Sequence, residues 1–217
     1  MLLRSRLPGA HHQHLSPAAG QARCASSDPA RKAVILARSR TTWPWLALNA
    51  AGFQLGWLAC VIGGAGVGGI VGGVVLAAHL LCMARPGEWR WLVIFGLMGL
   101  AIDGSLALLG GYRFAPEDVR VGPLALWLLW LWPLFAMLIH HSLYWLWARP
   151  WLAALGGAIS APLSYFGGAK LAGVALAPWL LPSQAVIWAL ICLTVSLAAA
   201  RGYLTPPPGE NRSPAAD

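Results

Sequence analysis

Charged residues are scarce in this chain of 217 amino acids: Asp, Glu, Lys and Arg make up 10% of it. A soluble domain averages about 25%. Acids are the rarest, with 7 Asp and Glu against 15 Lys and Arg, while hydrophobic residues make up 58%. The mean hydropathy is +0.63. This composition excludes a soluble enzyme, a disordered tail protein and a disulfide-rich secreted scaffold, and it indicates an integral membrane protein.

Cysteines are few and scattered, with no paired spacing of the kind that binds metal or forms a redox pair. The sequence also shows no phosphate-binding loop, no nucleophile–base set and no spacing typical of metal ligands. We therefore predict no metal and no cofactor from motifs, and an enzymatic role is the less favoured one.

The basic residues surround the apolar runs and do not form a stripe. Seven of the 15 precede the first run, and most of the others lie at the borders of runs. Cytoplasmic flanks of membrane helices show this distribution, whereas a nucleic-acid site needs a basic stripe on a folded surface. The expected partner is the lipid bilayer, and no nucleic acid is expected.

The apolar runs predict the spans, each of which needs roughly 20 residues. The run over residues 43–83 has no Asp, Glu, Lys or Arg and would be about 60 Å long as one helix, twice the hydrocarbon thickness. The glycines Gly63, Gly64 and Gly66 offer the turn that divides it. We predict an all-α bundle of six transmembrane helices, at about 45–62, 67–83, 91–109, 123–146 (kinked at Pro133), 151–170 and 181–200.

Basic residues also predict the orientation. With the N-terminus inside, the inner segments hold 12 of the 15 Lys and Arg and the outer loops hold 3, which satisfies the positive-inside rule. Six spans return the C-terminus to the cytoplasm. Residues 1–42 are predicted to be a basic leader without ordered structure, residues 43–203 the membrane domain, and residues 204–217 a disordered tail.

Small residues recur every four positions in the helix over 151–170, at Gly156, Ser160, Ser164 and Gly168. Helices in lipid pack closely where such residues let their backbones approach. The stripe indicates tight contacts within one bundle, or, as the alternative, contact with a second copy or another membrane protein.

Polar residues inside the spans are candidates for function. Asp103 lies past the middle of its helix, where an unpaired carboxylate costs several kcal/mol; it has a functional role, or it is a neutral or hydrogen-bonded structural acid. Lys170 either reaches inward as its partner or extends to the headgroups. Asn49 and Gln54 must point into the bundle, because lipid offers their amides no hydrogen bonds.

Three histidines, His79, His140 and His141, fall in the predicted cytoplasmic third of the membrane. Histidines from different helices at one depth can bind a haem or a metal, or relay protons. Their spacing is unspecific and we expect no carboxylate at that depth, so interfacial histidines are the favoured interpretation.

Several of these residues together resemble a bacterial family of uncharacterised inner-membrane proteins, domain-of-unknown-function family 2878. The resemblance covers residues 45–200 and rests on these positions: Asn49, Phe53-Gln54-Leu55-Gly56-Trp57, Cys60-Val61, His79, Asp103, His141-Ser142-Leu143, Trp145, Pro162-Leu163-Ser164-Tyr165 and Gly168-Ala169-Lys170. His140 departs from it, since the family has an asparagine there, and the leader is longer than the family's short start. The resemblance implies fold and a bacterial inner-membrane location, without chemistry.

Three classes of function remain. A non-enzymatic scaffold or partner subunit is the first; a small transporter or permease that uses Asp103 is the second. The third is a haem-binding or lipid-modifying membrane protein that uses His79, His140 and His141. The candidate functional residues in the membrane are Asp103, Asn49, Gln54, His79, His140, His141, Ser164, Tyr165 and Lys170.

Overall fold

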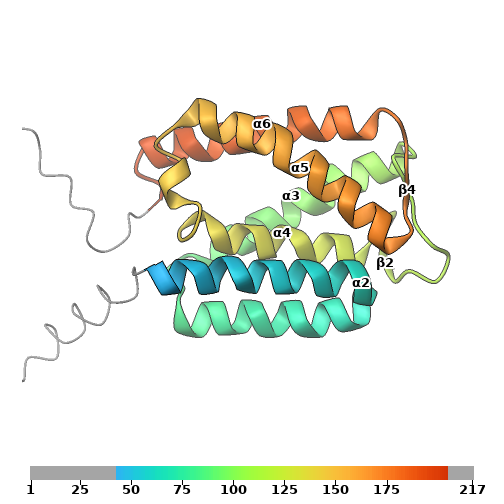
Figure 1. Ribbon diagram of the computed structural model, residues 1–217, viewed down its shortest axis with the longest axis horizontal. Helices are drawn as coiled ribbons and strands as arrows, with labels where there is room; N and C mark the ends of the chain where they lie inside the picture. Colours follow the sequence, from blue (N-terminus) through green and yellow to red (C-terminus); the bar gives the residue numbers. More distant parts are fainter. Residues whose placement is uncertain (1–42, 205–217) are drawn as a thin grey trace, which may run out of the picture. The chain divides into compact units, whose positions relative to one another are not determined.

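The computed structural model describes residues 43–204 (Figure 1). The predictions for 1–42 and 205–217 lie outside the described residues. The elements are α2 (Trp43–Cys82), α3 (Trp89–Leu108), β1 (Tyr112–Arg113), β2 (Arg120–Val121), β3 (Leu124–Ala125), α4 (Leu126–Ile139), a 3₁₀ turn (Tyr144–Leu146), α5 (Pro150–Ala172), β4 (Ala175–Leu176) and α6 (Leu180–Ala200).

Helix α2 consists of two arms that reverse direction at Gly64, whose φ of 62° and ψ of −157° are not helical. The side chains of Asn49 and His79 approach to 3.5 Å across this reversal. Thirty residues of continuous helix would separate them by about 45 Å. The arms pack closely, because a Cβ at Gly68 would lie 2.6 Å from Cα of Cys60. Figure 1 shows them side by side in blue and teal.

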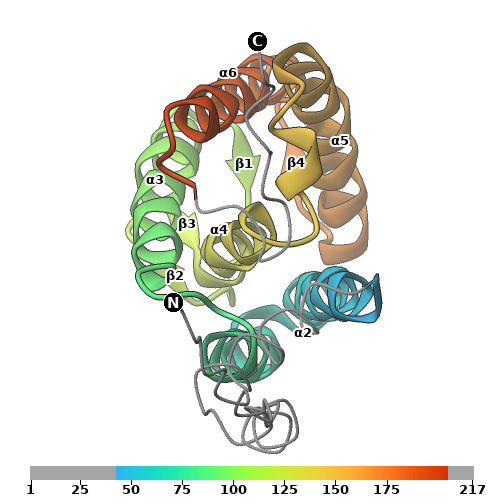
Figure 2. The ribbon, with the colours of Figure 1, turned by 90° about the vertical axis from the view of Figure 1, so that its left-hand side faces the viewer.

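Helix α4 is the central element of the described fold: it packs on α2 and α3, while α5 packs on α6 (Figure 2). Most of its residues are buried, and Pro133 lies inside it. With 14 residues, α4 is shorter than the predicted span over 123–146. The helix ends at Ile139. Beyond His140, the side chains of His141 and Ser142 hydrogen-bond to Glu88 and Asn49, and the chain tightens into the 3₁₀ turn.

Short strands occupy the loops and were not predicted. Strand β1 pairs with β4, with Tyr112 opposite Leu176, and β2 pairs with β3. The first pair ties the loop after α3 to the loop after α5, and this holds Tyr112 in a buried position.

Four helices, α2, α3, α5 and α6, are long and apolar enough to cross a membrane, and α4 is a shorter apolar helix. Large apolar side chains cover their outer surfaces; Leu81, Leu108 and Ile70 are all more than two-thirds exposed. Water would not favour so much exposed apolar surface, but lipid does. The described fold is that of an all-α membrane protein.

Candidate functional site

Asp103 of α3 is fully buried, and each of its oxygens accepts two hydrogen bonds. The Tyr112 hydroxyl and Gln184 Nε2 each donate to Oδ1 at 2.8 Å. Trp132 Nε1 donates to Oδ2 at 2.8 Å, and the Tyr165 hydroxyl donates at 2.6 Å. We call these five residues the Asp103 cluster. The donors come from β1, α4, α5 and α6, so one carboxyl group joins four elements to α3.

Lys170 takes no part in these bonds. Its side chain is exposed at the end of α5, with Nζ 5.6 Å from the centre of the Phe166 ring. The hydrogen bonds of Asp103 therefore come from neutral donors. Burial raises the pKa of Tyr112, and the Asp103 carboxylate beside it raises that pKa further. The Tyr112 hydroxyl consequently keeps its proton and acts as a donor.

A cavity of about 460 Å³ lies among α2, α4, α5 and α6. Tyr112, Trp132 and Tyr165 belong both to its wall and to the Asp103 cluster, whereas Asp103 itself is not a lining residue. Asp103, which the sequence analysis considered as a residue of a transporter or permease, therefore lies behind the wall of this cavity and not in it. The other lining residues are Phe53, Gln54, Trp57, Val61, Trp127, Leu128, Leu131, Phe135, Leu138, Leu143, Ser160, Ala161, Ser164, Gly168, Ala169, Val174, Leu176 and Trp188.

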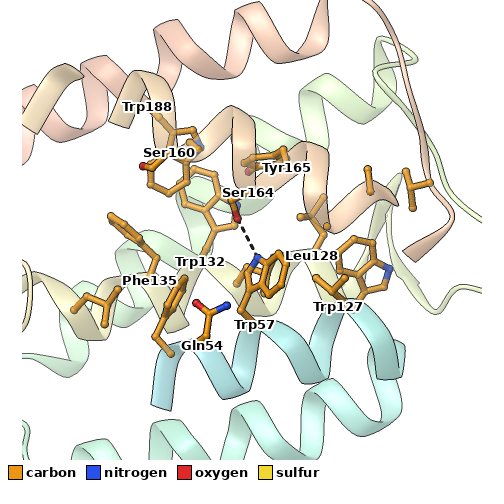
Figure 3. A pocket seen from close by; sticks show the side chains of 18 of the residues that line it. Gln54, Trp57, Trp127, Leu128, Trp132, Phe135, Ser160, Ser164, Tyr165 and Trp188 are labelled. Carbon is orange, nitrogen blue, oxygen red and sulfur yellow. Dashed lines mark hydrogen bonds between the residues drawn. The ribbon is translucent and has the colours of Figure 1, made fainter. Parts of the chain in front are cut away.

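Aromatic rings form much of this wall. Trp132 and Trp188 stack with their centroids 5.0 Å apart, and Phe135 meets Trp188 edge-on at 4.8 Å. Figure 3 shows Trp57 of α2 and Ser164 of α5 meeting across the cavity; Trp57 Nε1 donates to Ser164 Oγ at 3.0 Å. Such packing fixes the rings as rigid walls.

The polar groups that line the cavity are neutral. They comprise the amide of Gln54, the hydroxyls of Ser160 and Ser164, and the tyrosine and tryptophan groups already named. No Asp, Glu, Lys, Arg or His appears among the described residues that line it. Gln54 lines this cavity, although the residue as a whole is exposed (Figure 3). The wall suits an apolar molecule with at most an uncharged polar group.

A second polar cluster lies where α2 and α4 end and α3 begins. His79 Nε2 lies 2.8 Å from Glu88 Oε1, and His141 Nε2 lies 3.1 Å from each Glu88 oxygen. The backbone N–H of Arg85 donates to Glu88 Oε2 at 2.9 Å. Exposure of the side chain is 1% for His79 and Glu88 and 9% for His141. We call His79, Glu88 and His141 the histidine–glutamate cluster.

Glu88 stands outside α3, at its N-cap. Burial by itself raises the pKa of Glu88, but hydrogen bonds from His141 and His79 and the backbone N–H of Arg85 outweigh it, so the pKa lies below its usual range. Glu88 is therefore an anion that accepts from both imidazoles. The sequence analysis expected no carboxylate at the level of the histidines, and that was wrong. Glu88 is the only acid of the loop between α2 and α3, and this was the signal that could have found it.

Asn49 orients His79 from the other side. Its amide nitrogen donates to Met137 O at 3.1 Å, and its oxygen accepts from Ser142 Oγ at 2.8 Å. These two bonds turn the amide nitrogen toward His79 Nδ1, at 3.5 Å. Nδ1 is then the unprotonated nitrogen, and the proton on Nε2 is the one that Glu88 accepts.

His140 lies beside this cluster without joining its bonds. It is 4% exposed, and neither ring nitrogen has a hydrogen-bond partner among the described residues. Its ring meets Trp91 edge-on at 5.7 Å. The structure thus brings two of the three candidate histidines, His79 and His141, together with Asn49 and Glu88. Two other candidates lie elsewhere: Gln54 lines the cavity, and Asp103 lies behind the cavity wall.

The sequence analysis missed the hydrogen-bond partners of Asp103 on other elements, because no sequence pattern predicts which residues will contact it. Gln184, Tyr112 and Trp132 reach Asp103 over separations of 81, 9 and 29 positions. A tyrosine or tryptophan in an apolar segment predicts burial or an interfacial position, not a particular acceptor.

Comparison with curated proteins and with solved structures gives no match. The family model described as "Protein of unknown function (DUF2878)" matches residues 46–194, which include α3 to α5 and most of α2 and α6. Both polar clusters and the cavity lie within the matched region, and so does every candidate functional residue of the sequence analysis. The chain therefore belongs to the DUF2878 family of proteins of unknown function.

Proposed function

We propose that this protein binds an apolar, chain-like molecule, of the lipid or isoprenoid class, in the cavity among α2, α4, α5 and α6. The cavity is the single observation that carries the proposal. Its volume of about 460 Å³ falls in the range of about 300–1,000 Å³ that ligand pockets occupy. Hydrogen bonds to Asp103 fix several of the aromatic rings that line the cavity. This favours a permanent cavity over a gap left by imperfect packing.

The chemistry of the cavity wall restricts the class of ligand that can bind. A charged headgroup would lie unpaired against these neutral side chains and would cost several kcal/mol. Gln54, Ser160 and Ser164 offer hydrogen bonds to one uncharged polar group, such as a hydroxyl or a carbonyl. The ligand we propose is therefore a neutral lipid, a fatty alcohol or a polyisoprenoid.

This proposal favours the handling of a lipid-like solute over a scaffold. Three of the four stripe residues, Ser160, Ser164 and Gly168, line the cavity, and a Cβ at Gly168 would lie 3.5 Å from a methyl group of Val61 in the same chain. Gly156, by contrast, has open space beside it. A partner subunit or a second copy therefore remains a prediction of the sequence, for which Gly156 is the stripe residue that stays available.

We propose further that the chain crosses the inner membrane of a bacterium six times, with both termini in the cytoplasm. The two arms of α2 and the helices α3 to α6 supply six segments. The ends that carry Arg85, Arg90, Arg149 and Arg201 are the basic, cytoplasmic ones. Alkaline phosphatase fused after Glu117 should be active, and after Gly87 inactive; the reverse result would overturn this orientation.

Photo-crosslinking tests the ligand. A fatty alcohol with a diazirine on its chain, added to the protein in lipid nanodiscs, should label residues of the cavity wall, as located by mass spectrometry. Ser160→Trp should block this labelling because the indole fills the cavity. Ile159→Trp is the matched control, since Ile159 is 54% exposed on the outer face of the same helix.

Labelling confined to outer, lipid-facing residues would overturn the proposal, and so would equal labelling of the cavity in Ser160→Trp and Ile159→Trp. Melting temperatures of both variants are measured alongside, so that loss of the fold is distinguished from loss of the cavity.

A further inference from the structure

We propose that His79, Glu88 and His141 form a binding site for a divalent first-row transition-metal ion such as Zn²⁺ or Fe²⁺. One ligand atom from each residue lies within 4.8 Å of the other two. The three residues come from the end of α2, the N-cap of α3 and the segment after α4. The site is separate from the cavity, so the proposal of a metal site does not depend on the proposal of an apolar ligand.

The geometry needs little change to admit an ion. Ligand atoms about 2.1 Å from a tetrahedral ion lie roughly 3.4 Å from one another. The present distances are 2.8 Å between His79 Nε2 and Glu88 Oε1 and 3.1 Å between His141 Nε2 and Glu88. Each imidazole nitrogen would have to move away from Glu88 by a few tenths of an ångström, and the two imidazole nitrogens, which lie within 4.8 Å of each other, would have to take up the same separation of roughly 3.4 Å.

The donor set suits such an ion. Imidazole binds Zn²⁺, Fe²⁺ and other first-row metals, and two histidines with one carboxylate leave a coordination position open for water or substrate. Of the three side chains, His141 is the most exposed, at 9%. Glu88 supplies the negative charge that offsets part of the charge of the ion.

His140 is an independent observation that points to a missing partner at this end of the fold. A buried imidazole with both nitrogens unpaired is costly, and His140, beside His141, finds no hydrogen-bond partner within residues 43–204. Water or another group drawn in by an ion at the neighbouring cluster would give its ring a hydrogen-bond partner. A purely structural link among His79, Glu88 and His141 leaves His140 unexplained.

Metal binding changes the protons of the cluster. A nitrogen that binds the ion cannot carry a proton, so each imidazole that now donates from Nε2 has to hold its proton on Nδ1 instead. In His79 the proton moves from Nε2 to Nδ1, which faces the amide nitrogen of Asn49. The amide has to turn and present its oxygen, which costs the hydrogen bond to Met137 O. Asn49 is thus the outer partner of the site, and such partners commonly change metal affinity 10–100-fold, as an order of magnitude.

Cobalt binding tests the proposal. The full chain is purified without a polyhistidine tag, and His11, His12 and His14 are replaced by Gln so that they cannot bind metal. Co²⁺ should then give the visible ligand-field absorption of a four- or five-coordinate ion at one equivalent per chain, and Zn²⁺ should displace it. The melting temperature should rise with added Zn²⁺.

Glu88→Gln removes the anionic ligand and keeps the size of the side chain, so Co²⁺ affinity should fall at least about tenfold. Glu117→Gln makes the same chemical change at an exposed acid and should leave the affinity unchanged. If Glu88→Gln does not fold, His141→Gln replaces the most exposed ligand and serves in its place. Absence of the ligand-field bands, or bands unaffected by Glu88→Gln and His141→Gln, would show that the cluster is only a hydrogen-bonded link between helix ends.

Discussion

Replacing Asp103 by Asn is the sharpest perturbation of the Asp103 cluster. Asn has nearly the same shape, but one oxygen becomes an NH₂ group that donates. Two of the four donors, either Tyr112 with Gln184 or Trp132 with Tyr165, then face another donor in place of an acceptor.

Interhelical hydrogen bonds in membranes average about 0.6 kcal/mol and reach about 1.7 kcal/mol. Two lost bonds at a site that excludes water therefore predict a destabilisation of about 1–3 kcal/mol for Asp103→Asn. Tyr165→Phe removes a single donor and leaves three on the carboxyl group, so about 1 kcal/mol is expected. Reversible unfolding in mixed micelles titrated with sodium dodecyl sulfate measures both values.

A double-mutant cycle between Asp103→Asn and Tyr165→Phe makes the test specific. If the two groups bond as the structure shows, the double variant should lose less stability than the sum of the single variants, by about 0.5 kcal/mol or more. Additive losses, or an Asp103→Asn protein as stable as wild type, would refute the role of Asp103 as the centre of the cluster. Labelling of the cavity by the diazirine probe should fall together with stability in Asp103→Asn, because three wall residues depend on the carboxyl group.

Two further predictions concern close helix contacts. In Gly99→Ala the new Cβ would lie 2.2 Å from the ring of Trp132, so the ring must move by about 1 Å. We expect the stability to fall by about 1–3 kcal/mol and the tryptophan fluorescence spectrum to change. Gly96 has open space beside it on the same helix, so Gly96→Ala should keep the stability of the wild type. In Gly157→Ala the Cβ meets the backbone of α6. This variant should lower the melting temperature more than Gly99→Ala does, because backbone atoms cannot rotate away as a side chain can. Gly156→Ala, at the neighbouring position, should be neutral, and equal melting temperatures for Gly157→Ala and Gly156→Ala would contradict the observed helix contact.

The sequence predicted those parts of the fold that depend on local chemistry. The reversal at Gly64 follows from the length of the apolar run and from the freedom of glycine at positive φ. Burial of Asn49 and Asp103 follows from the cost of a polar group in lipid. These inferences need only the residue and the bilayer, so one sequence was enough.

The identity of the contacting residues was beyond prediction, because it depends on which helices are neighbours and how far each is turned. Gln184 and Asp103 are 81 positions apart, and their hydrogen bond requires α3 and α6 to meet at one depth. Glu88 was overlooked for a related reason: in the sequence it is one charge in a basic loop, and only the fold brings it to His79 and His141.

The Asp103 cluster and the cavity depend on each other. In lipid, apolar side chains gain little by leaving one apolar environment for another, so hydrophobicity alone neither closes a bundle nor keeps a space within it. Hydrogen bonds to Asp103 fix the side chains of Tyr112, Trp132 and Tyr165, and these three residues form part of the cavity wall. Since the same three side chains bond to Asp103 and line the cavity, the bonds that satisfy a buried acid also hold the aromatic wall in place around the cavity.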